Sequence, residues 1–594
     1  MSGSEVSVTI GYDTAVDEKY SVYASISFAV LLLGIGVPLW WHTTAVPRVS
    51  LPYAGIEALS DLDINIKTKI VVVALSRDRA ESLVHHITDA FKNSSICRIE
   101  VIYHVISSNL VTSAFTHHEL EKIASAFDLD VGQLLLLETN NLNDAVLAGS
   151  RRTIYFSTET TASTLIQVLS EWVLLEKSLT LTRNALTEPT LYSLDEENRR
   201  RFPASPAYDV LITVVNPDPE KLKVAWDLRV MAEEYVEPFL SELSILSNFS
   251  VKSQWLYLLP LDVSPKRVPD SSPLGRHFAL SEDVLPQLIT PLEKKLASQV
   301  SLHPTINFVI YAVPCDSAPL HIYTRSGHRS KINANVEAFL SPRWGGVVLI
   351  NPPVEACMAA KLDQPVTIVP EQTTIVGTFL TQLKLLLGIP EPVIKSLSFL
   401  FVYSSSTHFF YFPFYYPFID MMKSVSTMHL FFFQKFLNGV TAVSLPGLKL
   451  RDWEVDALLR VRTIEQLTSA KLTLQSIAQL LQEIGNIVIT DIVGNRIKTA
   501  LRLVEESAQR LTHGDLAVGF LLSKEAFVTA EAAFSDPTLF ALLYFPEDQK
   551  YAVYTPLFLP AMVPVLLSLK NIYRYYFHRR VNNPLKETAP GQNK

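Results

Sequence analysis

Cysteine is scarce in this chain of 594 residues, which contains only Cys97, Cys315 and Cys357. Three cysteines cannot build the framework of several disulfides that stabilises small secreted domains, and their spacing does not match a zinc site. At most one disulfide can form, and the sequence leaves open whether any two of them are bridged. A chain of this length can bury enough apolar surface to fold without a bridge.

Glycine is also rare, at 20 residues, so there is little from which to build a phosphate-binding loop. The sequence has no Gly-x-Ser-x-Gly nucleophile elbow, no glycine-rich nucleotide loop and no His-Glu-x-x-His zinc motif. The adjacent histidine pairs at 85–86 and 117–118 point about 100° apart on a helix, which suits chelation poorly. We therefore predict no catalytic residue, no cofactor-binding residue and no metal ligand.

An excess of positive charge is lacking as well, since the net charge is −8. Without a basic field over the chain, nucleic acid is not an expected partner. Hydrophobic residues make up 48% of the sequence, and the mean hydropathy is +0.21. These values are too apolar for a typical soluble protein and too polar for a polytopic transporter. They indicate one large folded body with a few membrane segments.

Two uncharged hydrophobic runs are present, one near each end. Residues 21–41 can cross the roughly 30 Å hydrocarbon core at about 1.5 Å per residue, and Trp40 and Trp41 suit the membrane interface. A signal peptide is the alternative, but acidic residues precede the run and no small-residue cleavage site follows it. Residues 551–569 form the second run, whose three prolines a membrane helix tolerates when neighbouring helices satisfy the freed carbonyls. We therefore predict two transmembrane helices.

The charges that flank the second run predict the orientation. Basic residues dominate the tail 570–594, and positively charged flanks stay cytoplasmic. Two crossings then place the tail 1–20 in the cytoplasm as well, and the region 42–550 in the lumen of the secretory pathway. The sequons at Asn93 and Asn248 lie in that region and are N-glycosylation candidates.

The region 42–396 alternates between two patterns. Short continuous apolar runs, typical of strands buried on both faces, are followed by stretches typical of helices. We predict strands at 70–75, 99–106, 134–137, 210–215, 255–261 and 306–313, and helices at 79–92, 117–127 and 162–186. The alternation predicts a lumenal α/β domain with a mostly parallel or mixed sheet and helices on its faces.

In the region 446–550 the apolar residues recur with helical spacing instead. Three successive apolar stripes lie within residues 453–536, and the second of them ends at Gly514. Three amphipathic helices with short connections predict a lumenal α-helical unit before the second membrane segment.

Residues 397–445 are atypical. The stretch 397–437 is dominated by Phe and Tyr and is interrupted by Pro413, Pro417 and Asp420. As an exposed loop it would be an aggregation hazard. Three interpretations stay open: a lumenal excursion that touches the membrane, a buried segment, or a stretch that is not native, such as translated intron.

Two Asp-x-Asp pairs, Asp61 with Asp63 and Asp128 with Asp130, are candidates for metal chemistry. Metal-dependent glycosyltransferases hold a divalent cation with such a pair, and carboxylate oxygens suit that cation. A lumenal, membrane-anchored glycosyltransferase-like enzyme is therefore the alternative function. Helix capping and solvation explain the same residues without a metal.

The turn at residues 342–346 is a candidate contact surface. Arg343 and Trp344 are residue types that are enriched in interfaces, and the two glycines after them allow close approach of the backbone. A purely structural turn before the apolar run 347–350 is the other interpretation.

Several stretches resemble the PIG-S family of glycosylphosphatidylinositol (GPI) transamidase subunits. They are residues 38–44 (PLWWHTT) with 51–53 (LPY), 341–346 (SPRWGG), 452–454 (DWE) with the helix through residue 489, and 544–560 (YFPEDQKYAVYTPLFLP). The resemblance covers both predicted membrane helices and most of the region between them. It departs at about 397–445, which favours the non-native interpretation of the aromatic stretch.

The resemblance implies a non-catalytic subunit of a complex in the endoplasmic reticulum membrane. That complex cleaves a C-terminal signal from a proprotein and joins the new carboxyl end to the amine of a preformed glycolipid. The nucleophile is expected in the cysteine-protease-like subunit PIG-K, and the other expected partners are PIG-T, PIG-U, a Gaa-type subunit and the lipid bilayer. Direct contact with the GPI glycolipid or the proprotein stays open, and no cofactor is implied.

Overall fold

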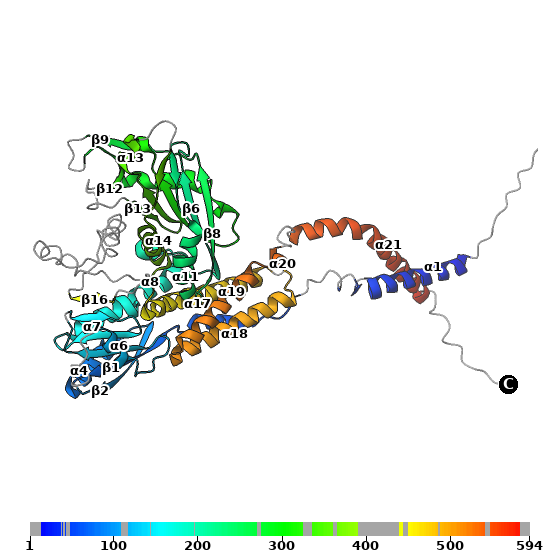
Figure 1. Ribbon diagram of the computed structural model, residues 1–594. Coiled ribbons are helices and arrows are strands. Elements are labelled where there is room, and N and C mark those ends of the chain that lie inside the picture. The colour runs from blue at the N-terminus through cyan, green and yellow to red at the C-terminus, as the bar shows by residue number, and fades with distance from the viewer. Residues whose placement is uncertain are drawn as a thin grey trace, which may run out of the picture. The chain divides into compact units, whose positions relative to one another are not determined.

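The computed structural model describes most of the chain (Figure 1). The described residues are 14–36, 38–39, 42, 48–107, 117–142, 144–194, 196–269, 275–324, 336–359, 365–389, 439–443, 449–484, 487–540 and 547–581. They form two compact units. The larger contains Gly55–Leu474 and Thr499–Ala530, and the smaller contains Met1–Ala54, Gln475–Lys498 and Glu531–Lys594. The aromatic stretch 397–437 lies outside the described residues.

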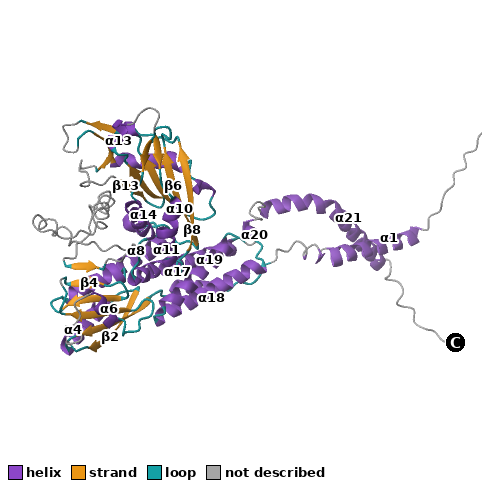
Figure 2. Ribbon diagram, viewed as in Figure 1, coloured by secondary structure: helices purple, strands orange, loops and turns teal. Residues whose placement is uncertain are grey.

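The larger unit begins with a six-stranded sheet in the order β16-β4-β5-β3-β1-β2. Figure 2 labels β4 and β2 of this sheet. Its strands are β1 (Ile66–Ala74), β2 (Cys97–Val105), β3 (Leu134–Thr139), β4 (Val146–Ala148), β5 (Thr153–Ser157) and β16 (Val440–Ala442). All neighbours are parallel except β4 and β5. Every residue of β3 is buried, as expected for a strand covered on both faces.

Helix α4 (Arg77–Phe91) shows why the helices form where they do. The Ser76 side chain accepts a hydrogen bond from the Arg79 amide and caps the first turn. Ala80, Leu83 and Ile87 recur at helical spacing and are buried against the sheet. This local agreement between capping and amphipathicity made the helix predictable.

The single long helix predicted at 162–186 is wrong. The chain forms α7 (Ala162–Val168), a π-helical turn η3 (Leu169–Val173) and then α8 (Glu176–Thr187). Leu175 has a positive φ of 53°, which breaks the helix. The break redirects the chain, so that Leu174 before it and Leu179 after it are both buried.

A second sheet of the same unit has the order β13-β14-β11-β6-β8. Its strands are β6 (Ala207–Asn216), β8 (Asn248–Tyr257), β11 (Thr305–Ala312), β13 (Val336–Ser341) and β14 (Gly345–Ile350). Only β13 runs antiparallel to its neighbour. Helix α12 (Leu285–Glu293) packs into the core on one face. Helix α14 (Gln372–Leu387) covers the other face, where the Phe308 and Phe379 rings lie 4.8 Å apart.

Three long helices follow the two sheets: α17 (Asp452–Glu483), α18 (Asp491–His513) and α19 (Leu516–Phe534). Gly514 adopts a φ of +92° between α18 and α19, which allows the tight connection. The structure thus confirms mixed α/β sheets with helices and a helical region toward the C-terminus. The boundary residues of the predicted domains stay predictions.

The remaining elements are short or lie in the smaller unit. They are α1 (Thr14–Ala29), η1 (Val30–Gly36), α3 (Tyr53–Ala58), η2 (Leu59–Asp61), α6 (His117–Ala124), α9 (Glu196–Arg200), β7 (Leu222–Val224), α10 (Leu228–Met231), η4 (Ala232–Val236), α11 (Glu237–Glu242), β9 (Lys266–Val268), β10 (His277–Ser281), η5 (Glu282–Val284), η6 (Ala297–Val300), η7 (Cys315–Ser317), β12 (Leu320–Tyr323), α13 (Val354–Ala359), β15 (Val366–Ile368), α20 (Pro537–Phe540) and α21 (Glu547–Val581).

In the smaller unit, α1 packs against α21. Val22 and Val565 are buried, whereas many other apolar side chains of α1, η1 and α21 are exposed, among them Leu31, Ile35 and Leu566. Of the helices in the described part of the chain, none has both the length and the apolarity that a membrane span requires.

Candidate functional site

In a sheet of this kind, ligands bind outside the carboxyl ends of the strands, at the point where the strand order reverses. In the first sheet this point lies between β1 and β3. The buried Glu138 carboxylate there accepts a hydrogen bond from the Leu75 amide at 2.8 Å and lies 3.4 Å from Arg79 Nε. The Arg79 guanidinium also donates to the Thr160 carbonyl. The chain's own ion pair therefore occupies the position where such a fold would hold a ligand.

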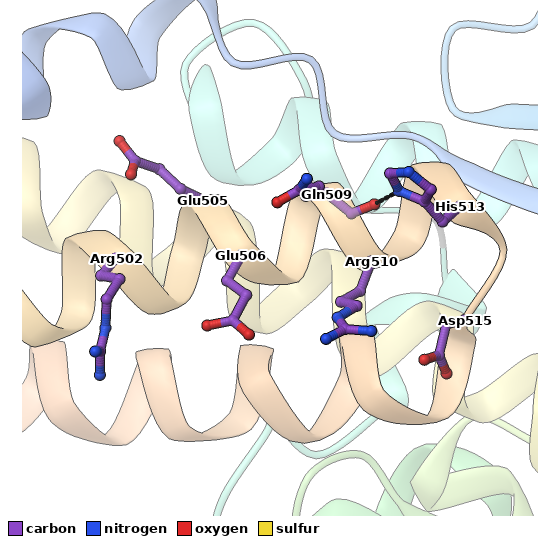
Figure 3. Close-up of a pocket in the computed structure, with 7 residues that line it drawn as sticks. All are labelled: Arg502, Glu505, Glu506, Gln509, Arg510, His513 and Asp515. Carbon is purple, nitrogen blue, oxygen red and sulfur yellow. Dashed lines mark hydrogen bonds between the residues drawn. The ribbon is translucent and has the colours of Figure 1, made fainter.

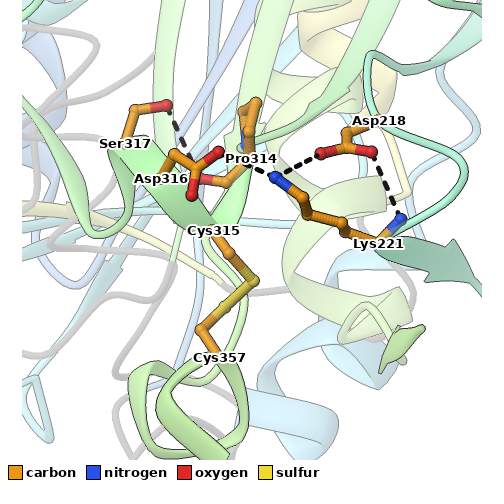
Figure 4. The surroundings of a disulfide bond; sticks show 7 residues. All are labelled: Asp218, Lys221, Pro314, Cys315, Asp316, Ser317 and Cys357. Carbon is orange, nitrogen blue, oxygen red and sulfur yellow. Dashed lines mark hydrogen bonds and ion pairs between the residues drawn. A yellow bond between two sulfur atoms is a disulfide. The ribbon is translucent and has the colours of Figure 1, made fainter. Parts of the chain in front are cut away.

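In the second sheet the corresponding point lies between β6 and β11. Figure 4 shows residues that follow these two strands, together with the nearby disulfide. Lys221 Nζ lies 3.0 Å from a carboxylate oxygen of Asp316 and 3.6 Å from one of Asp218. The pKa of Lys221 is raised, mainly because its ammonium donates a hydrogen bond to Asp316. A disulfide joins Cys315, just after β11, to Cys357 in α13. Ionic and covalent links thus fasten this edge.

The three cysteines thus differ in their bonding state. Cys315 and Cys357 are bridged, and Cys97 is a buried free thiol. Burial raises the pKa of Cys97 to about 12. Because the thiolate is the nucleophile, this thiol is unreactive near neutral pH.

Helix α17 carries buried charges that contact the first sheet and its connections. Arg152, just before β5, donates to the buried Asp456 carboxylate from Nε at 2.6 Å and from Nη2 at 3.1 Å. The same carboxylate accepts from the Gly132 amide at 2.9 Å. One turn further, the fully buried Arg460 donates to the carbonyls of Gly132 at 2.7 Å and Val173 at 3.2 Å.

The opposite side of α17 contacts the second sheet's segments in the same way. Arg462 donates to the carbonyls of Phe202 at 2.8 Å and Leu387 at 3.2 Å. Glu465 accepts from the Ala204 amide at 3.3 Å. Helix α17 therefore joins the segments around the first sheet to those around the second through buried, charge-assisted hydrogen bonds. Such bonds fix the orientation of the joined segments better than apolar contacts do.

Sequence reasoning missed this role of α17. Charged residues on an amphipathic helix are normally assigned to its solvent face. The available signal was their density: Glu454, Asp456, Arg460 and Arg462 fall within nine positions that also include leucines and valines.

A groove of about 570 Å³ runs along α18 (Figure 3). It is lined by Arg502, Glu505, Glu506, Gln509, Arg510, His513 and Asp515. His513 Nδ1 is 2.7 Å from the Gln509 carbonyl, which ties that ring to its own helix. The other lining groups are exposed or half-buried. The groove is a charged surface, and sequence reasoning singled out none of the residues that line it.

The predicted site residues lie apart from one another. Asn93 is exposed in the turn after α4, and Asn248 is exposed at the first position of β8. Arg343 is exposed in the turn between β13 and β14, and its amide donates to the Arg200 carbonyl at 3.2 Å. Trp344 is buried in the core of the second sheet. Glycosylation of either asparagine and a partner contact of the turn stay predictions.

The two Asp-x-Asp pairs lie before β1 and before β3, at the amino ends of parallel strands. Asp63 is ion-paired with Arg98 at 3.1 Å, and Asp130 accepts from the Gln133 side chain at 2.8 Å. Within the described ranges, no three His, Cys, Asp or Glu residues are grouped to hold a metal ion. The placement of these pairs gives no support to a glycosyltransferase-like site.

In the larger unit one helix thus joins two α/β regions, and the chain's own ion pair fills the switch point of the first sheet. The chain belongs to the PIG-S family: the model of the Phosphatidylinositol-glycan biosynthesis class S protein matches residues 27–579.

Curated relatives align with nearly the whole chain. The "GPI-anchor transamidase component PIGS" of Homo sapiens is 32% identical over 93% of this chain and 94% of its own length. The protein of that name from Rattus norvegicus is 31% identical with the same coverage. The "GPI transamidase component GPI17" of Saccharomyces cerevisiae is 21% identical over 92% of this chain and 91% of its own length.

Proposed function

We propose that this chain is a non-catalytic component of the GPI transamidase, the complex that attaches GPI anchors to the C-terminus of proproteins. The match to the PIG-S family over residues 27–579 carries the proposal, because the relatives are named as components of that complex. Two features of the structure support the non-catalytic role. Arg79 and Glu138 fill the switch point of the first sheet, and a disulfide and an ion pair link the segments at the switch point of the second sheet.

The proposed partners are the subunits PIG-K, PIG-T, PIG-U and the Gaa-type subunit, with the nucleophile in PIG-K. A scaffold for such partners must hold its surfaces in fixed relation to one another. The buried contacts of α17 with both sheets supply that rigidity, since breaking them would leave charges unpaired inside the protein.

We further propose an endoplasmic reticulum location with the larger unit in the lumen and both tails in the cytoplasm. The Cys315–Cys357 bridge supports an oxidising compartment. Exposure of Asn93 and Asn248 leaves both sequons accessible to glycosylation. The apolar side chains exposed on α1, η1 and α21 suit a lipid environment for residues 21–41 and 551–569.

Depletion of the chain tests the function. We expect GPI-anchored proteins to disappear from the cell surface and their uncleaved precursors to accumulate. Re-expression of the full chain should restore both. Normal surface levels in cells that lack the chain would contradict the proposal.

Protease treatment of sealed microsomes tests the orientation. We expect the larger unit to be protected and only short tails to be removed. Digestion of the larger unit before detergent is added would rule the lumenal location out.

A further inference from the structure

Strand β8 forms one of the two edges of the second sheet (Figure 1). Its ten residues pair in parallel with β6 along their whole length, from Ala207↔Asn248 to Asn216↔Tyr257. In the described part of the chain, β8 pairs with no other strand. One side of its backbone therefore has hydrogen-bonding groups that the sheet does not use.

The direction of these groups follows from the two ends of the strand. The Asn248 amide donates to the Pro206 carbonyl at 3.0 Å, and the Leu258 amide donates to the Asn216 carbonyl at 3.0 Å. Since successive residues of a strand point their backbone groups to opposite sides, the even-numbered residues bond to β6. The odd-numbered residues direct their N–H and C=O groups to the free side: Phe249, Val251, Ser253, Trp255 and Tyr257.

Charge protects the other long edge strand, which has two charged residues, more heavily than it protects β8, which has one. In β2, Arg98 pairs with Asp63 at 3.1 Å and Glu100 pairs with Lys67 at 2.7 Å. Such charges are the usual protection of an edge against further strands. The single charged residue of β8 is Lys252, and its ammonium is already 2.5 Å from the Asp209 carboxylate.

The end of β8 also offers apolar contact. The Trp255 and Tyr257 rings stack with centroids 6.3 Å apart. The Tyr257 side chain is 55% exposed and Leu258 is 72% exposed. Leu258 has a positive φ of 56°, so it ends the strand and turns the chain away from the free edge. Exposed aromatic side chains beside an unpaired backbone are the features by which strand-addition sites bind peptides.

We propose that β8 accepts an extended segment of another transamidase component as an additional strand. The inference rests on the proposed function, which supplies the occupant: a component of a multi-subunit complex must present surfaces to other chains. Main-chain hydrogen bonds to the five odd-numbered residues would give the affinity. Side-chain contacts with Tyr257 and Leu258 would fix the register.

A proline at Ser253 tests the edge directly. Its N–H points to the free side, so Ser253→Pro removes a central donor of the proposed interface and no hydrogen bond to β6. We expect the full-length tagged variant, purified in mild detergent, to recover about tenfold less of the other transamidase components. Ser253→Ala keeps the N–H and should recover them as the unmodified chain does. Gln254→Pro breaks the ladder to β6 and should lower the unfolding midpoint, which Ser253→Pro should not.

Hydrogen exchange gives a second readout that does not depend on a variant. We expect the amides of the odd-numbered residues to exchange at least about tenfold more slowly in the assembled complex than in the free chain, because a hydrogen-bonded amide must open before it exchanges. The even-numbered amides should be protected in both.

Unchanged exchange of the odd-numbered amides on assembly overturns the inference, as does normal assembly of Ser253→Pro or a contact of β8 with a second copy of this chain. Those results leave the proposed function standing. If the unmodified chain recovers no transamidase component, the proposed function fails first and the inference falls with it.

Discussion

Arg152 and Asp456 form a two-point ion pair, with Nε to Oδ2 at 2.6 Å and Nη2 to Oδ1 at 3.1 Å, across 304 positions of sequence. The Asp456 side chain is 2% exposed and that of Arg152 is 21% exposed. Burial by itself would lower the pKa of Arg152, but the hydrogen bond and charge of Asp456 outweigh it and raise that pKa. Arg152 therefore stays charged, and its two-point bond to Asp456 joins α17 to the first sheet.

Replacing Asp456 with Ala should lower the free energy of unfolding by about 3 kcal/mol, because it leaves the Arg152 charge without its main partner inside the protein. The Gly132 amide also loses its acceptor. Urea unfolding of the detergent-solubilised chain measures the change. Asp452→Ala is the matched control: its carboxylate is 3.7 Å from Arg152 and 47% exposed, so we expect less than about 1 kcal/mol. Equal losses in both variants would contradict the assigned role.

Removing the Cys315–Cys357 bridge with serines at both positions should destabilise the chain by about 4 kcal/mol, since the bridge closes a loop with a sequence separation of 42. Urea unfolding with and without reductant provides the test, and reductant should not affect the double variant. In the denatured unmodified chain, a maleimide should label one cysteine before reduction and three after it. Labelling of all three before reduction would exclude the bridge.

Gly345 allows the close approach of β14 to β11. A Cβ there would lie 1.8 Å from the Asn307 carbonyl oxygen, and the φ of +150° disfavours other residues. Gly345→Ala should therefore cost about 3 kcal/mol or more and reduce the yield of folded protein. Gly275→Ala is the control, because its φ is +70° but nothing lies within 4 Å of the added Cβ. Its cost should be only about 1 kcal/mol. Similar thermal midpoints for the two variants would show that the approach is looser than described.

Asp209 predicts a dependence of stability on pH. Burial would raise its pKa, but the hydrogen bonds from Lys252 and Ser301 prevail and hold the pKa below its ordinary value. Because the folded pKa is the lower one, the carboxylate stabilises the folded state above about pH 3.9, and this is lost as the pH falls through the folded pKa.

Asp209→Asn should therefore lower the free energy of unfolding by about 1 to 2 kcal/mol at pH 7. The expected loss is small because Lys252 is half-exposed, and solvent screens its charge. The difference between the variant and the unmodified chain should shrink below about pH 4. Unfolding curves at several pH values measure it, and a difference that stays constant in acid would be inconsistent with ionisation of Asp209.

Asn93→Gln and Asn248→Gln test the sequons. Each variant should migrate faster than the unmodified chain on a denaturing gel, because one glycan is missing. Treatment with a glycan-removing enzyme should bring all forms to the same mobility. Ser95→Ala and Ser250→Ala destroy the same sequons while keeping the asparagines, and they should shift equally. Absence of any shift would argue against lumenal exposure of that site.

The sequence predicted the elements whose local signals agree. The run at 70–75 became most of β1, and the three helical stripes became α17, α18 and α19. Gly514 was correctly identified as the end of a helix, because a left-handed residue there favours glycine. These signals are short-range, so one stretch of chain contains all of the information.

The features that could not be predicted from the sequence depend on tertiary contacts. The break at Leu175 places a leucine in a left-handed conformation, which no local preference favours. Trp344 was a candidate contact residue, yet it is buried in a cluster with residues from six strands and α12. The partners of Asp456 and Arg460 lie about 300 positions away. Only the folded chain shows that these charges face inward.

The arginines of α17 obtain most of their partners from main-chain oxygens, those of Val173, Gly132, Phe202 and Leu387. Any amino acid provides such an oxygen, so evolution can replace the side chains at the receiving positions and keep the bonds. The guanidinium groups have no such freedom, because a lysine ammonium cannot reach two separated carbonyls with a planar fork. A relative that keeps these two arginines can therefore keep the same bonds even where the residues that supply the carbonyls differ.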